Sequence, residues 1–168
     1  MSALIRNQCI VEDDYLAIDD EGALPHSGKV IVSLARWQKD EENLRKHPGE
    51  VGVLIPNTAE IPAIWPQLND RNLIVLEFPA FGDGRAYSQA QLLRQRYHFI
   101  GDIRATGAAV VRDQIHNMMR AGINNFLLRS DQDAKVCLDA CSDFTLSYQN
   151  GADSTTQTVL QKRRRQFS

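Results

Sequence analysis

The sequence predicts an α/β fold in which successive βα units form a mainly parallel sheet. From residue 29 onward, short apolar segments alternate with segments of helical periodicity. Lys29–Leu34 (KVIVSL) is almost entirely apolar, as are strands buried on both faces of a parallel sheet. Connections between such strands are right-handed crossovers. A doubly wound sheet and a partial β/α barrel both satisfy the pattern.

Six strands are predicted after an N-terminal β-hairpin. The hairpin spans residues 4–18, with its turn at Glu12-Asp13-Asp14, and residues 19–28 form a loop. The strands that follow are apolar segments bounded by turn residues. They are Lys29–Leu34, Val51–Ile55, Leu73–Phe78, Ile103–Thr106, Phe126–Leu128 and Phe144–Tyr148.

The first two predicted helices have recognisable start signals. Ser33 caps the first helix, which ends at Pro48-Gly49. Thr58 caps the second helix, and Pro66 kinks or shortens it. The residues predicted to face the core are Trp37 and Leu44 in the first helix and Ile61, Ile64, Trp65 and Leu68 in the second.

The remaining three helices follow the later strands. The third begins near Arg85, the fourth ends at Gly122, and Ser130 and Asp133 form a capping box for the fifth. Arg94 and Arg96 are expected on a solvated face. The predicted core-facing residues are Ala86, Ala90, Leu93, Tyr97, Val111, Ile115, Met118, Met119, Ala134, Cys137, Leu138 and Cys141.

Length and charge favour one globular domain over residues 1–149 and a polar tail over residues 150–168. The chain has 168 residues, 43% of them apolar, and a net charge of −2. Lys162–Arg165 carry four positive charges, so residues 1–161 sum to −6. Such an acidic body argues against nucleic-acid binding. The tail is expected to be a short solvated terminus, and contact of its basic residues with RNA or an anionic membrane is the alternative.

The cysteines, histidines and apolar segments exclude several classes of protein. Cys137 and Cys141 are spaced to face the core as buried thiols, and the C-x3-C redox pair is the alternative. The four histidines have no metal-ligand spacing, and no nucleotide-binding or nucleophile-elbow motif occurs. No cofactor or metal is expected. No signal sequence or membrane-spanning segment is recognisable, so we expect a soluble, cytoplasmic protein.

The best candidate site lies in residues 73–122, where strands lead into helices. Loops at the carboxyl ends of parallel strands emerge at one edge, where α/β folds bind ligands. Asp83, Gly84 and Arg85 form the most unusual loop, and Gly82 and Gly84 allow positive φ and close backbone approach. Arg85 and Arg104 are expected to contact an anion there, with the first amides of the next helix. The alternative is purely structural: Asp83 caps the helix and Arg85 pairs with Asp83 or Glu77.

Further candidates lie in the first turns of the two helices that follow. Ser88 and Gln89 lie within reach of a ligand at the start of the third helix. Arg112 and Gln114 open the fourth helix, and an internal ion-pair network is the alternative for Arg112. Asp83 and Asp113 are the candidates for moving a proton if the protein is an enzyme.

The motif Glu77-Phe78-Pro79, with Phe81, Asp83-Gly84-Arg85 and Tyr87-Ser88-Gln89-Ala90, resembles the signature of a bacterial family of uncharacterised proteins. Its members are typically encoded beside the assimilatory sulfite reductase, and some are labelled oxidoreductases of sulfite reduction. The likeness extends over residues 4–149. The chain departs from the family pattern in having Ala80, Gly82, Ala86 and Ala121 where lysine, threonine, glycine and cysteine are common.

This resemblance implies a role in assimilatory sulfate and sulfite reduction. We expect an accessory protein that binds the reductase, or a small sulfur oxyanion, through the edge bearing Asp83, Arg85 and Arg104. Two alternatives stay open. One is a small-molecule enzyme acting on an anionic substrate, and the other is a non-catalytic scaffold that forms a homodimer.

Overall fold

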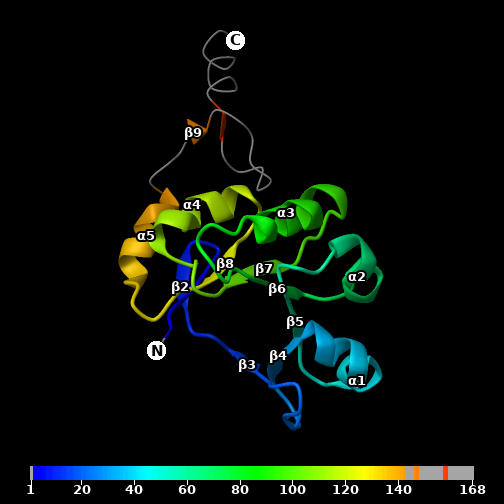
Figure 1. The fold of residues 1–168 in the computed structure, drawn as a ribbon. Coiled ribbons are helices and arrows are strands. Elements are labelled where there is room, and N and C mark those ends of the chain that lie inside the picture. Colours follow the sequence, from blue (N-terminus) through cyan, green and yellow to red (C-terminus); the bar gives the residue numbers. More distant parts are fainter. Residues whose placement is uncertain (1, 143–145, 148–156, 159–168) are drawn as a thin grey trace.

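A single eight-stranded sheet organises the chain in the computed structural model, which describes residues 2–142, 146–147 and 157–158 (Figure 1). The strand order is β2-β1-β8-β7-β6-β5-β4-β3. The strands are β1 (Leu4–Arg6), β2 (Cys9–Val11), β3 (Tyr15–Ala17), β4 (Lys29–Ser33), β5 (Val51–Ile55), β6 (Leu73–Glu77), β7 (Asp102–Thr106) and β8 (Asn125–Leu127). The helices are α1 (Leu34–Lys46), α2 (Ile61–Leu68), α3 (Arg85–Gln91), the π-helical turn η1 (Leu92–Arg96), α4 (Arg112–Arg120) and α5 (Ala134–Ser142).

The strand order decides between the two predicted architectures. From β4 to β8 the strands are parallel and each lies beside the one before it in sequence. Right-handed crossovers that always advance in one direction place every connecting helix on the same face of the sheet. The sheet is therefore not doubly wound. It curls into a half-barrel with helices on its convex side (Figure 1).

The connection between the two edge strands shows how strongly the sheet curls. In a flat sheet, seven strand spacings would separate β2 from β3 by about 34 Å. Only residues 12–14 join these strands. An extended chain from Val11 to Tyr15 spans at most about 14 Å. The two edges therefore approach each other, and residues 12–14 bridge them.

The N-terminal hairpin exists, but its turn was predicted in the wrong place. β1 and β2 pair antiparallel around Asn7 and Gln8, whose φ angles are 49° and 61°. Positive φ at both central positions is typical of the tight turns that join antiparallel strands. Residues 12–14, predicted as the turn, instead lead to β3, which pairs with β4 in parallel. Nothing within residues 4–18 indicates this partner.

Helix capping agrees with the sequence in part. The Ser33 side chain accepts a hydrogen bond from the backbone N–H of Arg36, as predicted for the start of α1. The N-cap of α2 is Glu60, which makes no side-chain cap, so the prediction for Thr58 was wrong. At α5, Asp133 alone accepts from the amides of Lys135 and Val136, which leaves no capping box with Ser130.

The predicted core residues are buried in most cases. The core includes Trp37, Leu44, Ile61, Ile64, Leu68, Ala86, Ala90, Leu93, Ile115, Met118, Cys137 and Cys141, while Trp65, Tyr97, Met119, Ala134 and Leu138 pack against it partly buried.

The prediction that Arg94 lies on a solvated face was wrong. Its guanidinium donates to the carbonyls of Phe99 and Gly101, before β7, and of Gly122, after α4. Burial lowers the pKa of Arg94.

The burial of Cys137 and Cys141 predicts a labelling pattern. Burial raises the pKa of both thiols, that of Cys141 to about 11, whereas Cys9 is exposed. Because the thiolate is the reactive form, brief iodoacetamide treatment of the native chain at pH 8 should modify Cys9 alone. In guanidinium chloride all three thiols should react, as peptide mass spectrometry will show. Native modification of Cys137 as fast as that of Cys9 would contradict this burial.

In the described part of the chain, two short strands follow α5. Leu146–Ser147 forms a strand, β9, but it pairs in parallel with β10 (Gln157–Thr158) and not with the main sheet. The other residues of the predicted strand 144–148 and of the tail 150–168 lie outside the described residues. Within the described part of the chain, no helix is long and apolar enough to cross a membrane.

Candidate functional site

The loops after β6, β7 and β8 meet at one edge of the sheet, as predicted. The backbone N–H of Ala109 donates to the carbonyl of Phe78, and that of Arg129 donates to the carbonyl of Val110. Gly107 allows the loops to come this close: its φ is +111°, and a Cβ there would lie 2.5 Å from the Phe78 carbonyl oxygen. The glycine that the edge requires is therefore Gly107, which the sequence did not single out.

Asp83 forms the centre of a local hydrogen-bond cluster. Its carboxylate accepts from the backbone N–H of Arg85 at 3.1 Å, from the Arg85 guanidinium at 2.6 and 3.0 Å, and from the Asn57 amide at 2.6 Å. The hydrogen bonds from Arg85 lower the pKa of Asp83 to about 2. Gly84 has an ordinary φ of −86°, and neither Gly82 nor Gly84 has positive φ or a close neighbour. The prediction that these glycines supply unusual backbone geometry was wrong.

Arg85 and Arg104, predicted to contact one anion, each pair with a different carboxylate of the chain. The Arg85 side chain is 60% exposed and paired with Asp83, and its backbone N–H is also used by that carboxylate. Arg104 lies in the middle of β7, and its side chain is 2% exposed. The two terminal nitrogens of its guanidinium donate to the Asp13 carboxylate at 3.0 Å each, and its Nε donates to the Asn125 side-chain oxygen.

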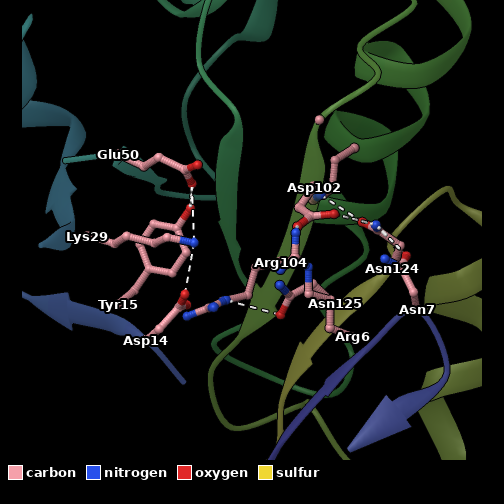
Figure 2. Close-up of polar contacts among 12 residues, drawn as sticks. Arg6, Asn7, Asp14, Tyr15, Lys29, Glu50, Asp102, Arg104, Asn124 and Asn125 are labelled. Atoms are coloured by element: carbon pink, nitrogen blue, oxygen red, sulfur yellow. Dashed lines mark hydrogen bonds and ion pairs between the residues drawn. The ribbon is translucent and has the colours of Figure 1, made fainter. Parts of the chain in front are cut away.

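Arg104 belongs to a polar cluster that holds residues 13–15 against the sheet (Figure 2). Lys29 contacts Asp14 at 2.8 Å, and the Tyr15 hydroxyl donates to Glu50 at 2.5 Å. The Arg104 guanidinium lies 5.2 Å from the centre of the Tyr15 ring. Burial and the Glu50 carboxylate raise the pKa of Tyr15. These contacts fasten the segment that bridges the sheet edges, and they occupy the guanidinium of Arg104, which the sequence predicted as a ligand contact.

The residues at the start of α4 have structural partners. The backbone N–H of Arg112 donates to the Gln132 side chain, and the Gln114 side chain accepts from the Tyr87 hydroxyl at 2.5 Å. The side chains of Arg112 and Asp113 approach to 3.4 Å, with Asp113 74% exposed. An exposed carboxylate of this kind lacks the desolvation that tunes a catalytic acid or base.

Gln89 and Ser88, by contrast, line a groove of about 440 Å³ between α3 and the segment that leads into α2. One wall comprises four residues on one face of α3–η1: Arg85, Ser88, Gln89 and Leu92. The opposite wall is Asn57, Thr58, Ala59, Glu60, Ile61 and Pro62. The hydrogen bond between Asn57 and Asp83 joins the two walls at one end.

The groove does not have the charge of an anion site. The charged residues that line the groove are Arg85 and Glu60. The Asp83 carboxylate pairs with the Arg85 guanidinium and neutralises its positive charge. One negative charge therefore remains. The backbone N–H of Arg85, the first residue of α3, also donates to the Asp83 carboxylate. The positive end of the α3 helix dipole therefore contributes little positive potential to the groove. Among the described residues there is no group of three or more side chains that could hold a metal ion.

The comparisons with known proteins identify a family but no activity. The model of a family described as "Bacterial protein of unknown function (DUF934)" matches residues 52–159, which include both walls of the groove and the Asp83–Arg85 loop. No curated protein matches the chain. Because the match covers more than half of the sequence, the chain belongs to the DUF934 family of bacterial proteins.

Proposed function

We propose that this protein is an accessory protein of assimilatory sulfite reduction that binds the reductase and does no chemistry of its own. We assign the protein to sulfite reduction because of the family resemblance, which is carried by Glu77-Phe78-Pro79, Asp83-Gly84-Arg85 and Ser88-Gln89. The pairing of Asp83 with Arg85 beside an open groove is the observation that favours binding over catalysis. The binding surface is the groove between residues 57–62 and 85–92.

The charged groups at this edge support a binding role. An acid–base catalyst at neutral pH needs a pKa near 7, which burial of a carboxyl normally supplies. The hydrogen bonds from Arg85 hold the pKa of Asp83 at about 2 instead. Every carboxyl pKa shift resolved among the described residues is downward. The enzyme alternative therefore has less support than the accessory role.

A sulfur oxyanion is also a weaker candidate for the ligand than the reductase. Arginine binds oxyanions through paired N–H donors, and the Arg85 Nε and Nη2 are both committed to Asp83. Arg104 is committed to Asp13 and Asn125. A protein surface, in contrast, can use the mixed apolar and polar walls of the groove.

The proposal predicts that a bulky charge in the groove abolishes association with the reductase. Ser88 is exposed on the α3 wall, so Ser88→Arg should fill the groove without disturbing the core. Co-purification of sulfite reductase with the tagged full chain should be retained by the wild type and fall at least about tenfold for Ser88→Arg, the effect of losing about 1.4 kcal/mol. Ser27→Arg, at an exposed position in the loop before β4, is the matched control.

Two results would overturn the accessory role. One is that intact sulfite reductase does not co-purify with the tagged wild-type chain. The other is turnover of sulfite by the isolated chain. Sedimentation of the chain alone tests the remaining alternative, because a scaffold that only dimerises would associate with itself and leave the reductase unbound.

A further inference from the structure

We infer that the groove accepts a lysine or arginine side chain of the partner protein. This inference rests on the proposed function and adds the chemistry of the contact. It comes from three features of the groove: a buried acceptor atom and a carboxylate, both without a partner among the described residues, and apolar wall residues that an alkyl stem can pack against.

The unpartnered acceptor is the side-chain oxygen of Gln89. The Gln89 side chain is buried, at 5% exposure, and its Nε2 donates to the carbonyls of Pro56 and Ala59 at 3.0 and 2.8 Å. Since both of these partners are acceptors, the amide nitrogen must face them, and the orientation of the amide is fixed. Among the described residues, the Oε1 atom then has no hydrogen-bond partner. A buried acceptor without a hydrogen bond destabilises the protein. A hydrogen bond from a donor on a ligand would remove this penalty.

Glu60 supplies the negative charge. It occupies the N-cap of α2, yet its side chain makes no capping hydrogen bond. It is exposed on the groove wall, and none of the ion pairs in the described part of the chain includes it. With Asp83 neutralising Arg85, the groove carries one net negative charge, on a body of residues 1–161 that carries −6. Both charges favour a cationic ligand.

The remaining wall residues suit the rest of such a side chain. Lysine and arginine have a flexible alkyl stem that packs on apolar surface while the charged head forms hydrogen bonds. Ala59, Pro62 and Leu92 offer that surface in the same groove. The cationic head would donate to Gln89 Oε1 and pair with the Glu60 carboxylate.

Small side-chain analogues test this inference directly. The ¹⁵N-labelled full chain is titrated with N-acetylarginine amide and N-acetyllysine amide, and the backbone and side-chain amide signals are followed by NMR. We expect saturable shifts at Thr58, Glu60, Ser88 and the Gln89 side chain. N-acetylnorleucine amide keeps the apolar stem without the charge and should bind at least about fivefold more weakly, as loss of about 1 kcal/mol implies.

Charge-removing variants provide the second arm. Glu60→Gln should weaken binding of the arginine analogue about fivefold, the loss expected for one charge-assisted contact of about 1 kcal/mol. Glu42→Gln, which removes a charge from an exposed position on α1, should leave it unchanged. Equal binding of the norleucine analogue, tighter binding of N-acetylglutamate amide, or shifts only outside the groove would overturn the inference.

The two proposals fail in different ways. If the arginine and lysine analogues do not bind but wild-type chain still recovers the reductase, the groove chemistry is wrong and the accessory role stands. If the analogues bind in the groove and no reductase is recovered, the accessory role is wrong and the cation site stands.

Discussion

Replacing Asp13 by alanine should destabilise the protein by about 3–5 kcal/mol, because it leaves the buried guanidinium of Arg104 without its counter-ion. Arg104 is almost fully buried, and both of its terminal nitrogens contact the Asp13 carboxylate at 3.0 Å. Asp13 also lies in the segment that bridges the two edges of the sheet. Urea denaturation followed by circular dichroism will measure the change in the free energy of unfolding.

The control for this prediction is a second arginine–aspartate pair that lies on the surface. Arg129 and Asp131 contact each other at 2.6 Å with about half of each side chain exposed. Exposed pairs contribute little, so Asp131→Ala should cost less than about 1 kcal/mol. If Asp13→Ala costs no more than Asp131→Ala, the bridging role of the buried pair is wrong.

A double variant separates the charge from the packing. Adding Arg104→Met to Asp13→Ala removes the unpaired cation and keeps much of the side-chain volume. Replacement of a whole buried ion pair by apolar groups is often neutral, so the double variant should recover at least about 1 kcal/mol of the loss. A double variant less stable than Asp13→Ala would show that Arg104 stabilises the sheet mainly through Asn125 and Tyr15.

Trp37→Ala should have a comparable effect, a loss of about 3–5 kcal/mol, because it empties the largest fully buried position. Trp37 is 0% exposed, and the guanidinium groups of Arg45 and Arg71 lie 5.3 and 4.8 Å from its ring. Thermal and urea unfolding will measure the loss.

Trp37→Phe provides a graded comparison. The indole Nε1 of Trp37 is buried and has no hydrogen-bond partner in the described part of the chain, so phenylalanine removes an unsatisfied donor along with some volume. We therefore expect a cost well below that of alanine, about 1–2 kcal/mol. Trp65, partly buried against Tyr97, should tolerate alanine better than Trp37 does. Equal losses for Trp37→Phe and Trp37→Ala would contradict this account of the core.

Much of the site could not be predicted because its partners are distant in sequence. Arg104 follows an isoleucine in a short strand, and nothing near it indicates that Asp13, 91 residues away, is its partner. Gln89 was identified only as a residue in the first turn of a helix, whereas its bonds to Pro56 and Ala59 make it part of the groove. Asp83 and Arg85 pair locally, two residues apart, and this structural alternative was already visible in the sequence.

Local sequence pattern was sufficient to predict the alternation of strands and helices, the Ser33 cap, the turn at Gly122 and most of the buried stripes. These depend on residues within a few positions of each other, so local pattern is sufficient. Three features became visible only in the three-dimensional fold: the curling of the sheet into a half-barrel, the bridging of its edges by residues 12–14, and the pairing of the charged groups. Those features depend on contacts between distant segments, and a local pattern does not encode them.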